Sequence, residues 1–195
     1  MNIQGWFASP LQAILFDASF YLWAVLELVN TFVIGRGRRR GTSRDRGSYW
    51  AILIAIYASI VLVAVTRALR LGLAPAPVQW AGLAVALTGM ALREWAILHL
   101  GRAFSPIVRV VPDQGLVTSG PYRRVRHPSY TGSIITFGGF GLAAGTWLGA
   151  LLVIAITLLA YNYRVRVEEQ AMLEVFGDEY QSYMARTGRF LPKIR

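Results

Sequence analysis

Residues 120–132 read Gly-Pro-Tyr-Arg-Arg-Val-Arg-His-Pro-Ser-Tyr-Thr-Gly, and the rest of the chain is best understood outward from them. The stretch holds three arginines, one of the two histidines and two tyrosines. Because a residue before proline avoids helical angles, Gly120 and His127 are expected in turns or extended backbone. Apolar residues then dominate 129–163, so the stretch is predicted to be a constrained polar loop leading into a membrane hairpin. A loop that only fixes membrane orientation by its charge is the alternative, but that role requires neither His127 nor Tyr130.

Long apolar runs elsewhere predict an integral membrane protein. Hydrophobic residues make up 55% of the 195 positions and gather in such runs, which suit a hydrocarbon core of roughly 30 Å. We predict an all-α fold with five transmembrane helices, at 10–34, 48–66, 78–98, 129–143 and 146–163. The last two form a hairpin whose first arm is short, and cytoplasmic helices follow at 164–176 and 178–187, separated by Gly177. The whole is predicted to be one membrane domain, with a three-span part at 1–98 and a cofactor-binding catalytic part at 99–195.

The basic residues predict the orientation of these spans. The net charge is +10, and 19 of the 20 basic residues are arginine. Placing 35–47, 101–128 and 164–195 on one side gathers 17 basic residues there. The positive-inside rule then predicts a cytoplasmic site and C-terminus, with the N-terminus outside. Since the arginines border apolar runs, membrane lipids are the expected partners and nucleic acid is not.

Composition also excludes several kinds of site. The chain has no cysteine, which rules out disulfides, thiolate metal ligands and a cysteine nucleophile. With only His99 and His127 available, no metal centre is predicted.

Four ionisable residues fall inside predicted spans, where each is costly. Asp17 is expected near the outer surface. Glu27, Arg93 and Glu94 are expected near the cytoplasmic end of their helices. We favour a structural pairing of the acids with Arg93 over a polar pocket beneath 101–128.

Two clusters carry the side chains with reactive chemistry, at 126–130 and at 164–169. Arg164 and Glu168 are four residues apart and therefore share one helix face. An ion pair that only stabilises the helix is the simple interpretation. However, 164–169 leaves the hairpin beside the point where 126–130 enters it, so the two clusters are predicted to enclose a pocket.

The stretches at 115–122, 126–132, 164–169 and 176–183 together resemble the isoprenylcysteine carboxyl methyltransferases and, more loosely, the membrane phospholipid N-methyltransferases. The similarity covers the C-terminal half from about residue 100. It implies an S-adenosylmethionine-dependent methyltransferase that takes a lipophilic acceptor from the bilayer. The resemblance further implies catalytic roles for Arg164 and Glu168, with Arg126 close to the acceptor. It implies a cofactor pocket formed by Val117, Gly120, Tyr122, His127, Pro128 and Tyr130, with Glu169 near it.

The class of acceptor follows less directly from the residues. A carboxylate is already ionised and needs an anion clamp, for which the guanidinium of Arg164 or Arg126 is suited. An amine would need a base, which Glu168 or His127 could provide. The surplus of arginine favours a carboxylate.

Two other functions fit parts of the sequence. One is a membrane reductase of the sterol reductase type, which uses a phosphorylated nicotinamide cofactor. The other is a non-enzymatic adaptor whose basic segment at 35–47 recruits anionic lipid. Phe176, Tyr180 and Tyr183 recur at helical spacing and are expected to pack the C-terminal helices rather than to join the site.

Overall fold

The computed structural model describes residues 6–34, 44–108 and 115–193, which contain five α-helices. These are α1 (Pro10–Phe32), α2 (Ser48–Ala68), α3 (Ala76–Leu100), α4 (Pro128–Ala143) and α5 (Trp147–Arg186). Two short 3-10 helices, η3 (Gly101–Ala103) and η4 (Gly120–Arg123), lie between α3 and α4. The all-α prediction is confirmed, with helix bounds close to those expected. The basic segment at 35–43 lies outside the described residues.

Four of these helices, α1, α2, α3 and α5, are long and apolar enough to cross a membrane. Helix α4 has 16 residues and is the short first arm of the predicted hairpin. Its partner α5 runs on well beyond the length of one crossing, for 40 residues in all. The extra length carries the C-terminal part of α5 past the apolar bundle.

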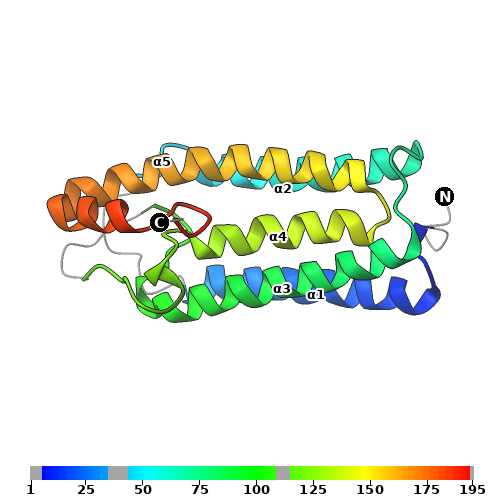
Figure 1. The fold of residues 1–195 in the computed structure, drawn as a ribbon, viewed down its shortest axis with the longest axis horizontal. Coiled ribbons are helices and arrows are strands. Elements are labelled where there is room, and N and C mark those ends of the chain that lie inside the picture. The colour runs from blue at the N-terminus through cyan, green and yellow to red at the C-terminus, as the bar shows by residue number, and fades with distance from the viewer. Residues whose placement is uncertain (1–5, 35–43, 109–114, 194–195) are drawn as a thin grey trace.

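The helices form two layers with α4 between them (Figure 1). Helix α2 packs against α5, and α1 packs against α3. Helix α4 contacts both α3 and α5, so it joins the layers. As a result, the segment before α4 and the far part of α5 lie at the same end of the molecule (Figure 1).

Small residues allow α3 and α4 to approach backbone to backbone. A Cβ atom added at Gly139 would lie 2.4 Å from the backbone nitrogen of Ala86. One added at Gly89 would lie 2.5 Å from the backbone nitrogen of Thr136. Close packing of this kind drives the association of helices in a membrane, because moving an apolar side chain from lipid to a helix interface gives little hydrophobic free energy. They hold α4 in a fixed position below the site.

The predicted pairing of the acids with Arg93 is confirmed for Glu27, whereas Glu94 bonds to Asn30 instead. Arg93 on α3 donates from Nε and Nη2 to both carboxylate oxygens of Glu27 on α1, at 2.5 and 2.8 Å. Its Nη1 donates to Ser133 on α4 at 2.8 Å. Glu94 accepts from Asn30 at 2.9 Å. These contacts connect α1, α3 and α4 by hydrogen bonds within the apolar region.

Helix α5 breaks at Gly177, where the backbone has φ 49° and ψ −124°. The predicted separation of two C-terminal helices is therefore confirmed. After α5 the chain returns to the segment before α4. Arg126 and His127 donate backbone hydrogen bonds to Gly188 and Arg189 at 2.9 and 3.1 Å, and Gly188 donates to Arg124 at 3.1 Å.

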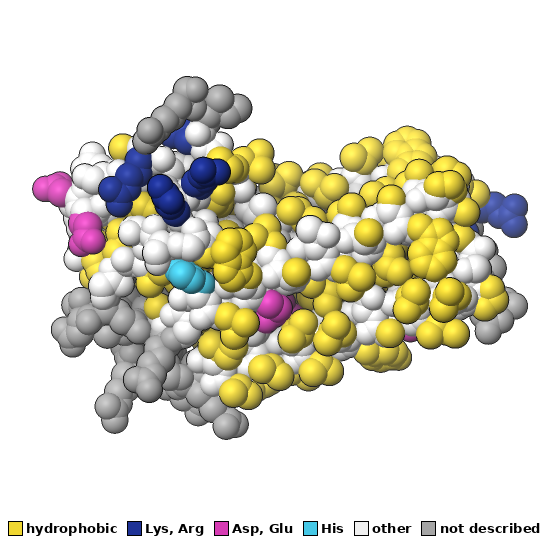
Figure 2. Space-filling view, turned by 60° about the horizontal axis from the view of Figure 1, so that its bottom comes forward, with side chains coloured by type: hydrophobic (Ala, Val, Ile, Leu, Met, Phe, Trp, Pro, Cys, Tyr) yellow, Lys and Arg dark blue, Asp and Glu magenta, His cyan; other side chains and the backbone are white. Residues whose placement is uncertain are grey.

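The surface separates by chemistry along the long axis of the molecule. Figure 2 shows most of the charged side chains visible on this face, and a histidine, toward one end, while hydrophobic side chains cover much of the rest. One acidic group in the middle and one basic group at the opposite end are the exceptions. Exposed apolar residues such as Leu22, Ile54 and Leu159 belong to this apolar region. Such a surface fits an integral membrane protein with a polar end in water.

Candidate active site

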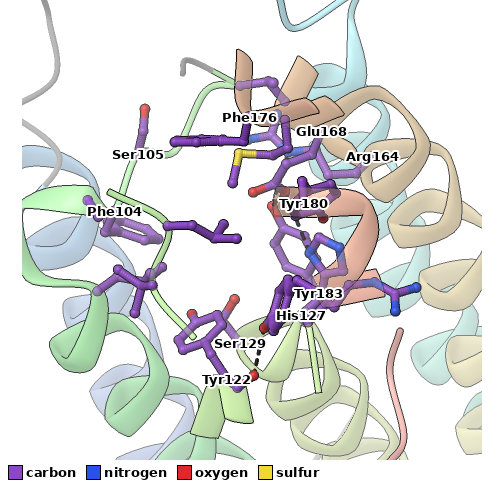
Figure 3. A pocket seen from close by; sticks show the side chains of 18 of the residues that line it. Phe104, Ser105, Tyr122, His127, Ser129, Arg164, Glu168, Phe176, Tyr180 and Tyr183 are labelled. Atoms are coloured by element: carbon purple, nitrogen blue, oxygen red, sulfur yellow. Dashed lines mark hydrogen bonds and ion pairs between the residues drawn. The ribbon is translucent and has the colours of Figure 1, made fainter. Parts of the chain in front are cut away.

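A cavity opens at the polar end of the bundle, between the segment before α4 and the C-terminal part of α5 (Figure 3). Its wall includes seven of the ten residues predicted for the site, namely Val117, Tyr122, Arg126, His127, Tyr130, Arg164 and Glu168. The other three, Gly120, Pro128 and Glu169, are not among the described residues that form this wall. Each of these three holds a residue of the wall in place.

Gly120 sets the path of the chain that brings Tyr122 to the cavity. It has φ 55°, and a Cβ atom there would lie 2.6 Å from the ring of His99. Tyr122 follows as a buried residue whose hydroxyl donates to the carbonyl of Ala96 at 3.3 Å. Burial and the negative charge of Glu168 raise the pKa of Tyr122, so its hydroxyl stays protonated.

His127 is fixed by its position at the start of α4. It precedes Pro128, the first residue of that helix, and its backbone is not helical. Its ring stacks on Tyr130 with 5.5 Å between centroids. Nδ1 lies 3.8 Å from Oε2 of Glu168, and Nε2 lies 3.4 Å from Oε1 of Glu169. The predicted meeting of the two clusters is therefore confirmed.

The hydroxyl of Tyr130 links the two predicted catalytic residues. It donates to Oε2 of Glu168 at 2.7 Å and accepts from Nε of Arg164 at 3.2 Å. The ring of Tyr130 is also stacked on Tyr161, with centroids 4.9 Å apart. Arg164 and Glu168 thus act on each other through a phenol that lies between them.

Arg164 is almost completely buried, at 2% exposure, and is held on several sides. Its Nη1 donates to Ser48 at 2.9 Å and to the carboxylate of Asp45. Its Nη2 donates to the carbonyl of Pro106 at 2.9 Å. Sequence reasoning missed Asp45 and Ser48, because both lie far before the first recognised motif, which begins at Gly115.

Arg126 is held by the C-terminal end of α5. Its Nε donates to Glu169 at 2.9 Å, and Nη1 donates to the carbonyls of Thr187 and Met184 at 2.5 and 3.1 Å. Glu169 also accepts from Arg189 at 2.6 Å. Glu169 therefore fixes the base of the site by pairing with two arginines, and Glu168 is the acid that reaches the cavity.

Aromatic and apolar residues complete the wall, and several of them were not predicted. Tyr183 donates from its hydroxyl to the carbonyl of Tyr122 at 2.6 Å. The expectation that Phe176, Tyr180 and Tyr183 only pack helices is wrong, since all three line the cavity. Their spacing on one helix face was the available signal, and the break at Gly177 brings that face onto the site. The other unpredicted residues of the wall are Leu100, Ala103, Phe104, Ser105, Ile107, Val108, Gly115, Leu116, Ser129 and Met172.

No group of three or more metal-ligating side chains occurs within 6–34, 44–108 and 115–193. The described wall of the cavity offers carboxylate, guanidinium, imidazole and phenol groups.

The part of the chain that forms most of this cavity is similar to known proteins. Residues 81–174 match the model of the isoprenylcysteine carboxyl methyltransferase family. This central part of the chain is therefore similar to that family.

Curated relatives and a solved structure extend the match. A protein-S-isoprenylcysteine O-methyltransferase of Schizosaccharomyces pombe is 33% identical over 118 residues, covering 60% of this chain and 50% of that protein. One from Tribolium castaneum is 35% identical over 121 residues, covering 58% of this chain and 41% of that protein. The structure of the eukaryotic intramembrane Ras methyltransferase superposes with a TM-score of 0.70 at 25% identity, covering 96% of this chain and 69% of that one. The chain thus spans about half the length of these two curated relatives.

The family match covers only part of the cavity. Tyr122, His127, Tyr130, Arg164 and Glu168 lie within the matched range. Tyr180 and Tyr183 follow it, and Asp45 and Ser48 precede it. The stretch that matches the family model is therefore accompanied at this site by residues on both sides of it.

Proposed function

We propose that this chain is an S-adenosylmethionine-dependent methyltransferase of the membrane, which methylates a lipophilic, prenyl-type acceptor at a carboxylate. The observation that carries the proposal is the linked set of Arg164, Tyr130 and Glu168 in a cavity at the polar end of an apolar bundle. The family match supports methyl transfer over nicotinamide-dependent reduction. The charge distribution supports a cytoplasmic cavity.

The cavity suits S-adenosylmethionine by its chemistry. Aromatic and aliphatic side chains such as Phe104, Met172 and Phe176 offer surfaces for a nucleobase. Glu168 keeps 32% of its side chain exposed, so its carboxylate is available to a cation or a ribose hydroxyl. When bound, this cofactor supplies a methyl group on a positively charged sulfur.

The residues of the chain then have separable roles. Methyl transfer is an in-line displacement, so alignment of the two reactants and exclusion of water provide most of the acceleration. Glu168 offsets positive charge in the cavity, and Tyr130 fixes its carboxylate by donating to it. Arg164 orients the Tyr130 hydroxyl by donating to it. Arg126 on the cavity wall shares the single carboxylate of Glu169 with Arg189, and the positive charge left over there attracts an acceptor carboxylate. The ionised carboxylate needs no general base.

The acceptor is expected to reach the cavity from the bilayer. Because the cavity lies at the end of the bundle where apolar helices meet polar segments (Figures 1 and 2), a lipid tail can stay among the helices while its charged end enters the site. A cysteine carboxylate that carries a thioether-linked prenyl chain has this combination of properties.

A labelled-methyl transfer assay with the protein in lipid nanodiscs tests the proposal. Three acceptors with the same prenyl chain are compared, ending in a cysteine carboxylate, its methyl ester or an amine. We expect label transfer to the carboxylate only, and a large loss of turnover in Glu168→Gln. Transfer to the amine instead would contradict the acceptor class. No transfer, together with no calorimetric binding of S-adenosylhomocysteine, would reject the enzyme.

A further inference from the structure

Arg164 needs a compensating negative charge, because a buried guanidinium without a partner is strongly unfavourable. Glu168 does not provide it directly, since Tyr130 lies between the two. The carboxylate that contacts Arg164 is that of Asp45, through Nη1. Asp45 lies just before α2, in the part of the chain that precedes the family match.

Asp45 is itself held in one position. Its Oδ1 accepts from the hydroxyl of Ser48 at 2.9 Å, and its Oδ2 accepts from the backbone N–H of Tyr49 at 2.9 Å. These contacts cap the first turn of α2, where a negative charge is favourable. Burial alone would raise the pKa of Asp45, but the hydrogen bond from Tyr49 and the charge of Arg164 hold it below its usual value. The carboxylate is therefore ionised at neutral pH.

The same carboxylate is connected to the wall of the cavity. The backbone N–H of Val108 points to Oδ1 of Asp45 at 3.4 Å, and Arg44 donates its backbone N–H to the carbonyl of Val108 at 3.0 Å. Pro106 accepts from Nη2 of Arg164 at 2.9 Å. Since Val108 lines the cavity, Asp45 joins one wall to the guanidinium.

We propose that Asp45 is a positioning residue of the active site. From its fixed place at the start of α2 it sets the position of the Arg164 guanidinium, and through Arg164 that of the Tyr130 hydroxyl and the Glu168 carboxylate. The N-terminal half thereby completes a site whose reactive groups come from the C-terminal half. The predicted change in kcat rests on the proposed function, whereas the predicted change in melting temperature does not.

A purely structural role for Asp45 predicts a different result. An N-terminal cap that only stabilises α2 would change the melting temperature and the amount of folded enzyme. It would leave the turnover of the folded fraction unchanged. It would also act in the same way whether or not residue 164 is an arginine.

The test compares four proteins in nanodiscs, namely the wild type, Asp45→Asn, Arg164→Gln and the double variant. Asparagine keeps the size and one acceptor oxygen while removing the charge. We expect Asp45→Asn to lower kcat on the order of 10- to 100-fold, which is the scale of a small misplacement of a reacting group. The affinity for S-adenosylhomocysteine is expected to stay within about threefold of wild type. The double variant should have neither a lower kcat nor a lower melting temperature than Arg164→Gln alone.

Glu174→Gln is the matched control, because Glu174 pairs with Arg44 on the exposed face of the same segment. It should leave kcat and the melting temperature close to wild type. If Asp45→Asn does not fold, Ser48→Ala replaces it, since this change removes a contact to both Asp45 and Arg164 and keeps both charges. A several-fold loss of kcat is then expected.

Two outcomes would overturn the proposal. One is a folded Asp45→Asn or Ser48→Ala protein with wild-type kcat. The other is an equal loss from Asp45→Asn in both backgrounds. If the wild type neither transfers methyl groups nor binds S-adenosylhomocysteine, the proposed function fails separately. Asp45 is then judged on melting temperatures, where strictly additive shifts of the two single variants would overturn its coupling to Arg164.

Discussion

At the scale of single residues, the site depends on groups that other residues hold in place. Tyr130 connects Arg164 to Glu168 by its hydroxyl, and its ring stacks on those of His127 and Tyr161. These two ring contacts hold the side chain without help from its hydroxyl. The hydroxyl is therefore free to serve the two charged groups.

Tyr130→Phe separates these two roles. The ring contacts remain, but Nε of Arg164 loses its acceptor and Glu168 loses its donor. We expect kcat to fall about 10- to 100-fold, because both groups lose their alignment, while stability changes by only about 1–3 kcal/mol. Steady-state kinetics and thermal unfolding measure the two effects.

Tyr163→Phe provides the control for this change. Tyr163 lies on α5 and donates to the carbonyl of Arg46 on an exposed part of the surface. Its loss should leave kcat near wild type. If Tyr130→Phe matched that behaviour, the linking hydroxyl would have no catalytic importance.

Residue-level prediction from sequence succeeded where the chain carries a local constraint. Pro128 forces the turn at His127, and the spacing of Arg164 and Glu168 puts them on one helix face, so their meeting with the 126–130 cluster was foreseeable. Asp45 was not, because its contact with Arg164 spans 119 residues and no local pattern marks it. Tyr183 was missed because helical spacing alone does not tell a packing face from a cavity wall.

At the scale of elements, the helices follow from apolar runs, but their packing does not. The predicted bounds were close because the helices are long and bordered by glycine, proline and arginine. Which helix contacts which depends on the matching of small residues across α3 and α4, on pairs such as Gly139 with Ala86. No feature of one helix alone identifies its partner.

Gly139→Ala tests that packing directly. The added methyl group would lie 2.4 Å from the backbone nitrogen of Ala86 on α3, so the two helices would have to move apart. We expect a loss of about 1–3 kcal/mol in unfolding free energy, typical of an overpacked contact, and a lower melting temperature. Thr88→Ala, on the exposed face of α3, should change stability by less than about 0.5 kcal/mol. Equal stability of the two variants would contradict a tight α3–α4 contact.

At the scale of the whole molecule, an ion pair inside the bundle joins the helices below the site. Arg93 on α3 contacts Glu27 on α1 and Ser133 on α4. The sequence predicted that both acids pair with Arg93, because nothing in the helix patterns distinguishes Glu27 from Glu94. The structure shows that Glu27 pairs with Arg93 while Glu94 bonds to Asn30.

Glu27→Gln should therefore weaken the bundle as a whole. Arg93 would keep its charge and lose its carboxylate partner, which costs on the order of 3–5 kcal/mol for a buried pair. Replacing both residues, by Glu27→Met with Arg93→Leu, should recover most of the loss because no charge is then left alone. Thermal unfolding in nanodiscs measures both, with the exposed Glu179→Gln as control. A double variant less stable than Glu27→Gln would contradict this explanation.

The segment after α5 is needed to complete the site, so the site forms late in synthesis of the chain. Backbone groups of Arg126 and His127 find their partners in Gly188 and Arg189, some sixty positions later. The helices can be threaded into a bilayer one after another as they leave the ribosome. The imidazole, in contrast, acquires its backbone support only once residue 189 has been synthesised and has reached it. Nascent chains shorter than this are therefore expected to lack the assembled site, which forms only when Gly188 and Arg189 dock beside the start of α4.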